Sequence, residues 1–183
     1  MKNLYSDFIT RLLLHPRKLE RLFPTEPNDY EQIIRVRETP DSACLAGGTI
    51  KPEGRIGWIR GGVFYWFDAL EEALQHIGAE LDPNSCYWRA MIFRRMGDIE
   101  NARNQFLTAG PHPVFNELHA RCADECPTMT KQYTWDPYVL LTMAEQHRFG
   151  CEDNLKELIT LQQIEFSVLF RYSWEQSVLP SES

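Results

Sequence analysis

The sequence lacks any apolar run long enough to form a transmembrane helix. Its longest apolar stretches, such as Leu12–Leu14 and Gly61–Phe67, fall far short of the roughly 20 residues that cross a bilayer. Lys2 is not followed by the apolar segment that a signal peptide needs. We therefore expect a soluble, cytoplasmic protein with no membrane partner.

Basic residues are also scarce. The chain has 183 residues with 19 Lys and Arg against 26 Asp and Glu, so its formal net charge is −7. No basic cluster is long enough to neutralise a phosphate backbone, which argues against nucleic acid as a partner. The cysteines number 5, an odd count at irregular spacing, and they indicate reduced thiols rather than a disulfide framework.

The motifs that define common enzyme classes are missing as well. The sequence contains no nucleophile elbow and no Walker loop. Gly57, Gly61 and Gly62 have neither the spacing nor the preceding strand of a dinucleotide-binding fingerprint. Neighbouring carboxylates such as Glu71 and Glu72 point to different sides of a helix, so we interpret them as solvated. We predict no cofactor.

Helical periodicity dominates what the sequence does contain. Apolar residues at spacings of three and four predict helices at 4–14, 29–37, 113–126, 137–149 and 153–176, and successive helices from Ile56 to Gly110. Asp136 followed by Pro137 favours a helix start, because aspartate accepts free amide hydrogens and proline suits the first turn. Residues 40–54 shift to Pro, Gly, Ser and Thr, which predicts a loop or hairpin-like excursion that can serve as a lid.

A 29-residue repeat is visible between Ile56 and Pro111. Shifting the chain by this distance places Ala73 on Ala102 and Ile77 on Phe106. The alanines would let paired helices approach closely, while the larger side chains fill the groove between them. We predict a single all-α domain of stacked antiparallel helix hairpins, similar to tetratricopeptide repeats or an α-solenoid. Its parts would be N-terminal helices and a loop (1–54), repeat-like hairpins (55–126) and C-terminal helices (127–183).

Two adjacent arginines, Arg94 and Arg95, interrupt an otherwise apolar helix. About 100° separate them on a helix, so one of them can point inward. An inward arginine near Asp98 would form a charge-assisted pair that locks the following turn. An arginine facing a groove beside Trp88 and His112 would instead bind an anionic ligand or a partner's carboxylate. Plain solvent exposure is the third interpretation.

His119, Cys122 and Cys126 share one helix face, with side chains that a soft metal ion could use. Phe115 and Leu118 lie on much of the same face, which is typical of a core stripe in which cysteine acts as a small apolar residue. A structural zinc site also needs a fourth ligand and closely paired cysteines. We therefore predict no metal site.

Glu165 is unusual among the acidic residues because Leu161, Val168 and Leu169 surround it at helical spacing. A buried carboxylate can be functional, although an arginine partner is the commoner explanation. The helix that carries it is apolar on most of its circumference, so we predict that it closes the core or forms a dimer interface. A homo-oligomer is one expected state.

The segment YWRAMIFRRMGDIENARNQF, with GPHPVF and WDPY beyond it, resembles a family of uncharacterised small helical proteins from bacteria and fungi. The matching positions are Tyr87, Trp88, Arg94, Arg95, Asp98, Asn101, Ala102, Gly110, His112, Pro113, Trp135, Asp136 and Pro137. That family has no assigned activity, so the resemblance implies a fold more than a function. Arg89 and Phe93 stand where the family pattern has histidines, and Met96 where it has glutamate, which weakens an enzyme interpretation for this chain.

Two classes of function remain open from the sequence, beside a purely structural or oligomerising role. The first is a helical-repeat binding module whose concave surface holds a protein, a peptide or a small anionic ligand. Its candidate binding residues are Trp88, Arg94, Arg95, Asp98, His112, Trp135 and Asp136. The alternative is an enzyme with a polar acid–base pocket between helices, in which His112 or His119 works with Glu165, Asp98 or Asp136.

Overall fold

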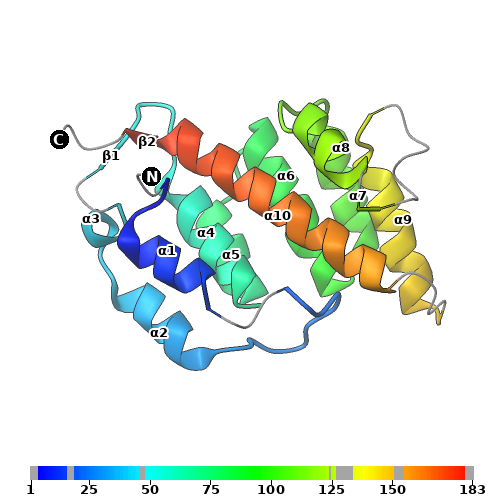
Figure 1. Ribbon diagram of the computed structural model, residues 1–183, viewed down its shortest axis with the longest axis horizontal. Coiled ribbons are helices and arrows are strands. Elements are labelled where there is room, and N and C mark those ends of the chain that lie inside the picture. Colours follow the sequence, from blue (N-terminus) through cyan, green and yellow to red (C-terminus); the bar gives the residue numbers. More distant parts are fainter. Residues whose placement is uncertain are drawn as a thin grey trace.

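The computed structural model describes residues 4–15, 19–45, 48–123, 125–126, 134–150 and 155–179. These residues form ten helices and two short strands (Figure 1). In chain order they are α1 (Asp7–Leu13), α2 (Tyr30–Glu38), α3 (Asp41–Cys44), β1 (Thr49–Ile50), α4 (Ile56–Trp66), α5 (Leu70–Ile77), α6 (Pro83–Met96), α7 (Ile99–Ala109), α8 (Phe115–Ala123), α9 (Pro137–Arg148), α10 (Leu155–Ser177) and β2 (Val178–Leu179). No helix in the described part of the chain is long and apolar enough to cross a membrane.

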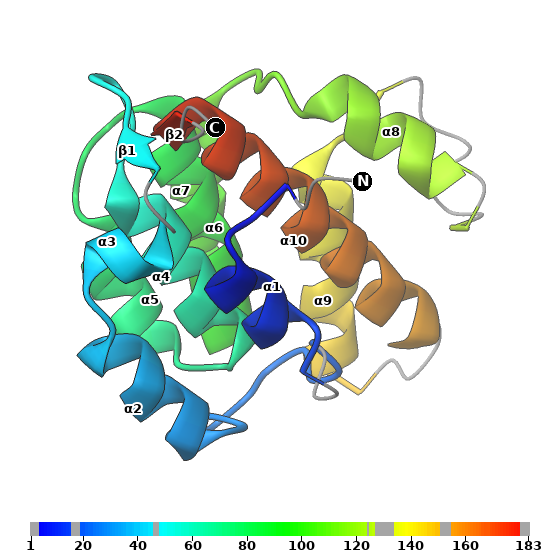
Figure 2. The same ribbon diagram turned by 60° about the vertical axis from the view of Figure 1, so that its left-hand side comes forward.

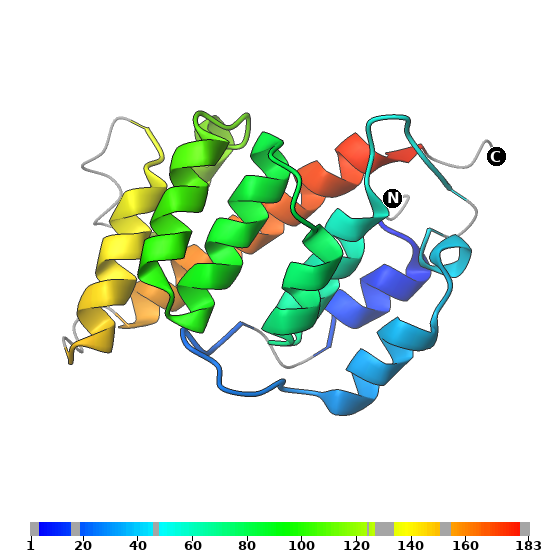
Figure 3. The same ribbon diagram turned by 180° about the vertical axis from the view of Figure 1, so that it is seen from behind.

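Adjacent helix pairs form the centre of the molecule. Helix α4 packs on α5 and α6 packs on α7, each pair joined by a short turn, and α5 in turn packs on α6. From behind, α9, α7, α6 and α5 lie side by side (Figure 3). The long helix α10 crosses the opposite side of this layer and contacts α4, α8 and α9 (Figure 1).

Small residues set the spacing of these helices. Ala73 on α5 and Ala102 on α7 are fully buried, as the repeat pattern predicts, and no strand interrupts residues 56–110. On α4, a Cβ atom at Gly57 would collide with the backbone carbonyl of His76, and one at Gly62 with the ring of Phe170. The glycines of α4 therefore let α5 and α10 approach it closely from two sides.

The turn between α6 and α7 is built by Gly97 and Asp98. Gly97 has φ of 77°, in the left-handed region, and its amide donates to the carbonyl of Arg94. Asp98 caps α7, because its carboxylate accepts hydrogen bonds from the backbone amide (3.1 Å) and the side chain (2.7 Å) of Asn101. The interpretation in which Asp98 pairs with an inward arginine is wrong, because Arg94 pairs with Glu165 and Arg95 with Asp68.

The segment 40–54 departs from the predicted loop. It contains α3 and β1, and β1 pairs antiparallel with β2, so that Thr49 faces Leu179 and Ile50 faces Val178. The amide of Lys51 extends this ladder by donating to the carbonyl of Ser177 at 2.8 Å. The fold is thus mainly helical, with one two-stranded ladder that the all-α prediction lacked.

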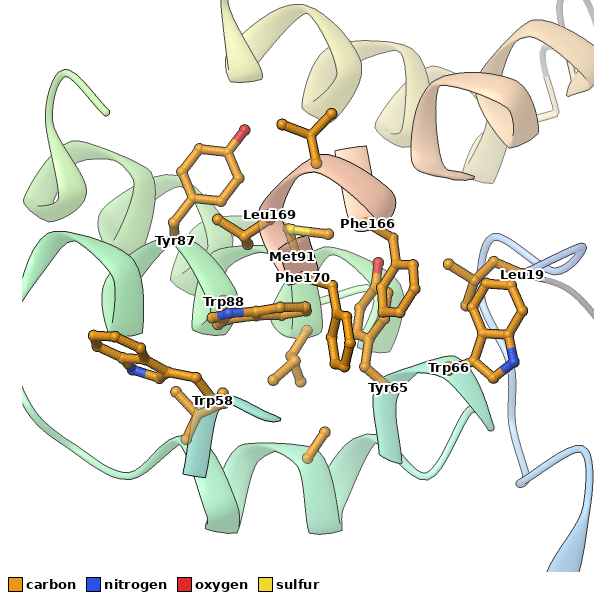
Figure 4. Packing of buried hydrophobic residues seen from close by; sticks show 14 of the residues in the cluster. Leu19, Trp58, Tyr65, Trp66, Tyr87, Trp88, Met91, Phe166, Leu169 and Phe170 are labelled. Atoms are coloured by element: carbon orange, nitrogen blue, oxygen red, sulfur yellow. The ribbon is translucent and has the colours of Figure 1, made fainter. Parts of the chain in front are cut away.

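Helix α10 closes the core, which is one of the two roles predicted for it. Its Phe166 and Phe170 stack on each other with ring centroids 5.4 Å apart, and Trp88 and Tyr65 pack around Phe166 (Figure 4). Buried apolar side chains of the described residues form one continuous cluster that reaches from α1 to β2. Its largest fully buried members include two of the predicted site residues, Trp88 and Trp135.

Cys122 and Cys126 also belong to this cluster and are fully buried. Burial raises the pKa of Cys122 to about 12 and that of Cys126 to about 11. Within the described residues, no group of three or more His, Cys, Asp or Glu side chains is placed to hold a metal ion. The two cysteines pack as small apolar side chains.

Candidate functional site

Both adjacent arginines of α6 point into the protein. Arg94 lies 2.5 Å from Glu165 of α10, and Arg95 pairs with Asp68 in the turn between α4 and α5. Both can be inward because α6 is buried on almost its whole circumference: it packs on α4, α5 and α7, and its side chains bond to α10. Each guanidinium group therefore has its own intramolecular carboxylate.

Glu165 is the centre of a buried polar network. The Tyr87 hydroxyl donates to it at 2.9 Å, and the indole nitrogen of Trp135 donates to that hydroxyl oxygen, also at 2.9 Å. Burial and the neighbouring Glu165 carboxylate raise the pKa of Tyr87 well above its usual range. Burial is the largest single effect on the pKa of Arg94 and lowers it, but the charge and hydrogen bond of Glu165, together with Tyr65 and Tyr87, outweigh burial and raise that pKa. The network joins α6, α10 and Trp135, which lies two residues before α9, and the arginine partner expected for a buried Glu165 is confirmed.

Asp68 organises a second polar cluster in the core. Its carboxylate accepts hydrogen bonds from Arg95, from Arg21 at 2.6 Å and from Asn28 at 3.3 Å. Its φ of 61° is unusual for a residue other than glycine, although aspartate tolerates this region better than most. The surrounding charges and amide groups hold Asp68 in this conformation, and they link the N-terminal segment to α6.

The other predicted site residues separate in space. Trp88 is buried and donates to Ser173 at 2.9 Å. Asp136 caps α9 by accepting a hydrogen bond from the amide of Tyr138 at 2.9 Å. Together with Trp135, Asp136 lines an apolar hollow of about 530 Å³, which we call the Leu107 groove. The residues lining this groove are Phe106, Leu107, Gly110, Pro111, Phe115, Thr134, Trp135, Asp136, Pro137 and Tyr138.

A larger hollow surrounds His112 at the Pro83 end of α6. Its volume is about 990 Å³, against 310 to 530 Å³ for four other hollows of the described residues. We call it the His112 groove. It is lined by Lys51, Glu53, Arg55, Trp58, Asp82, Pro83, Asn84, Pro111, His112, Pro113, Tyr172 and Gln176.

His112 is a neutral hydrogen-bond donor in this groove. Its ring is 5% exposed and packs between Tyr87 and Tyr172, with centroids 5.2 and 5.1 Å away. Burial lowers its pKa to about 4, against a weaker opposing effect of Asp82, so the ring is uncharged at neutral pH. Its Nδ1 accepts the amide hydrogen of Val114 at 3.4 Å, which places the proton on Nε2. No described residue bonds to Nε2.

The charges at the rim of the groove compensate one another. Lys51 and Arg55 are balanced by Glu53 and Asp82. Arg55 is 2.9 Å from Glu80 and 3.7 Å from the Oδ2 atom of Asp82. The other oxygen of Asp82 caps α6 by accepting from the amide of the third helical residue at 2.9 Å. The groove therefore does not select strongly for either sign of charge.

Sequence reasoning located one member of this groove, His112, and missed most of the others. Trp58, Asn84, Tyr172 and Gln176 come from three helices that are distant in the sequence. Their only local signal is the Asp-Pro-Asn helix start at Asp82. The remaining candidates belong to the core, to the α6–α7 turn or to the Leu107 groove.

No protein-family model, curated protein or solved structure matches the chain. The resemblance of the Tyr87–Pro137 segment to small bacterial and fungal helical proteins therefore stays a prediction.

Proposed function

We propose that this protein is an interaction module that binds a short peptide segment of a partner protein in the His112 groove. The observation that carries the proposal is the neutral, buried His112, whose Nε2 hydrogen has no acceptor among the described residues and lines a hollow of about 990 Å³. A backbone carbonyl of a bound peptide is a suitable acceptor for such a donor.

The composition of the groove favours a peptide over a strongly charged ligand. Its two basic and two acidic rim residues cancel, while Trp58, Tyr172 and three prolines supply flat apolar walls. Aromatic-lined grooves of this kind bind extended peptides, whose low conformational freedom reduces the entropic cost of binding.

The two grooves are neighbours, which favours an elongated occupant. Pro111 lines both the His112 groove and the Leu107 groove. Beyond Pro111, the exposed side chain of Leu107 and the ring of Phe115 offer an apolar surface. An extended chain that crosses Pro111 could place polar backbone groups near His112 and an apolar side chain in the Leu107 groove.

The enzyme alternative has less support. Glu165 is held in the core by Arg94 and Tyr87, while Asp98 and Asp136 are helix caps. None of the described contacts joins one of these carboxylates to His112. An acid–base pair in this groove would have to use a different carboxylate.

Two finer aspects of the architecture belong to the same proposal. The equivalent positions of Ala73 and Ala102 in successive helix pairs support an origin from a tetratricopeptide-like repeat. The four cysteines of the described residues are buried and unpaired, which supports a reducing, cytoplasmic location.

Selection of displayed random peptides tests the proposal without knowledge of the natural partner. Peptides enriched on the wild-type protein should bind at least about tenfold more weakly to Gln176→Trp, because an indole ring at this exposed position fills the groove. Lys156→Trp places the same ring elsewhere on α10 and should leave binding unchanged. The proposal fails if no peptide is enriched, or if Gln176→Trp binds the enriched peptides as tightly as the wild type.

A further inference from the structure

Two guanidinium groups of the described residues are free, and they lie close to each other. Of the arginines in the described residues, all but Arg11 and Arg35 form a hydrogen bond or ion pair with another part of the chain. Arg11 lies on α1 and Arg35 on α2; in Figure 2, α1 lies in front of the central helices and α2 lies below it and to the left. Both line the same pocket.

This pocket has the size and surface of a small-molecule site. Its volume is about 320 Å³, within the range of known ligand pockets. Phe8 and Leu12 provide an apolar surface, while Gln32 and the two arginines supply hydrogen-bond donors. Asp7 is the one carboxylate among its lining residues. It makes no ion pair with either arginine.

His15 adds a preorganised polar group to the pocket. Its Nε2 lies 3.3 Å from Asp29, whose other oxygen accepts the backbone amide of Gln32 at 3.2 Å and caps α2. The ring orientation is therefore fixed from one side. Its Nδ1 is buried and has no hydrogen-bond partner among the described residues. With the Nε2 hydrogen directed at Asp29, Nδ1 of the neutral ring is an acceptor, and a hydroxyl or N–H group of a ligand in the pocket would be a suitable partner.

We propose that the pocket between α1 and α2 binds a small organic anion whose phosphate or carboxylate group lies between Arg11 and Arg35. Arginine suits this role because its planar donors match the oxygens of either group in a bidentate geometry. The apolar body of the ligand packs on Phe8 and Leu12. This site is separate from the His112 groove and does not depend on the peptide-binding proposal.

Calorimetric titration at low ionic strength tests the site with phenyl phosphate, benzoate and inorganic phosphate. Phenyl phosphate or benzoate should bind more tightly than inorganic phosphate, because only they contact the apolar surface. The better of the two identifies the preferred anionic group. Arg11→Gln and Arg35→Gln should each weaken that binding at least about tenfold. Both side chains are exposed, so these variants should fold normally.

Two further variants make the test specific. Lys156→Gln removes a positive charge from α10, outside this pocket, and should bind like the wild type. Asp7→Asn removes the opposing carboxylate and should strengthen binding. The assignment is overturned if neither organic anion binds at millimolar concentration, if Lys156→Gln loses as much affinity as the arginine variants, or if inorganic phosphate binds as tightly as both organic anions.

Discussion

Arg94 and Glu165 form an ion pair from which solvent is excluded, since their side chains are 3% and 0% exposed. The two residues belong to α6 and α10, and their bond connects the central helix layer to the helix that covers it. A pair of this kind contributes little net stability compared with apolar side chains of similar volume, because desolvation of both charges is costly. Removal of one partner alone, however, leaves a buried charge without compensation.

Glu165→Gln should therefore reduce the free energy of unfolding by about 3–5 kcal/mol, measured by urea denaturation. The exposed pair between Arg171 and Glu175 provides a control, because Glu175→Gln should cost less than about 1 kcal/mol. Replacement of both core partners by apolar residues, Arg94→Met with Glu165→Leu, should cost less than Glu165→Gln alone. A similar loss of unfolding free energy in Glu165→Gln and Glu175→Gln would contradict this account.

Tyr87→Phe should destabilise the protein by about 1–3 kcal/mol, because it leaves the indole nitrogen of Trp135 without an acceptor and takes one donor from Glu165. Tyr138→Phe is the matched control, since no described residue bonds to the Tyr138 hydroxyl, and it should cost much less. Thermal and urea unfolding of both variants measure the difference. An equally stable Tyr87→Phe protein would show that this network adds nothing to stability.

Gly57→Ala should destabilise the protein, although alanine favours a helix by about 1 kcal/mol over glycine. The new methyl group would meet the rigid backbone carbonyl of His76, and the resulting shift of α5 should cost about 1–3 kcal/mol. Gly61→Ala should be better tolerated, because its closest contact is the end of the Ile77 side chain, at 2.7 Å. In urea denaturation, Gly57→Ala should have a lower free energy of unfolding than Gly61→Ala. The reverse order would refute the close approach of α4 and α5.

His112 should make stability fall as the pH decreases below neutrality. Folding lowers its pKa from 6.5 to about 4, so the unfolded chain binds the additional proton between these values. Protonation therefore favours the unfolded state, and up to about 3 kcal/mol is lost as the pH falls through this window. In His112→Phe the loss of stability over the same window should be smaller by a comparable amount. Identical pH profiles for both proteins would show that His112 is not buried in its neutral form.

Local patterns predicted the helices well because they depend on residues close in sequence. The helix expected at 137–149 is observed at Pro137–Arg148, and the one expected at 153–176 at Leu155–Ser177. Apolar neighbours at helical spacing also revealed that Glu165 is buried. Spacing along one helix, however, cannot identify a partner on another helix. The sequence therefore offers the nearby Asp98 as a partner for an inward arginine, whereas Arg94 pairs with Glu165.

The grooves were less predictable because they are assembled from distant segments. Asn84, His112 and Tyr172 lie on different elements and meet only after α10 has packed on the central helices. Arg11 and Arg35 gave no signal at all, since each is an ordinary exposed residue of an amphipathic helix. What distinguishes them is that neither guanidinium group forms a hydrogen bond or ion pair with another described residue, which becomes visible only in three dimensions.

Through the ladder between β1 and β2, Val178 and Leu179 position a segment that is distant in the sequence. They hold residues 49–50 in place, and the amides of Lys51 and Arg55 continue this attachment to Ser177. A chain shortened to end at Ser177 would keep all of α10 and most of its packing. It would nevertheless release the segment after β1, which forms one wall of the His112 groove. Binding measured on a protein shortened at this point would therefore differ from that of the full chain.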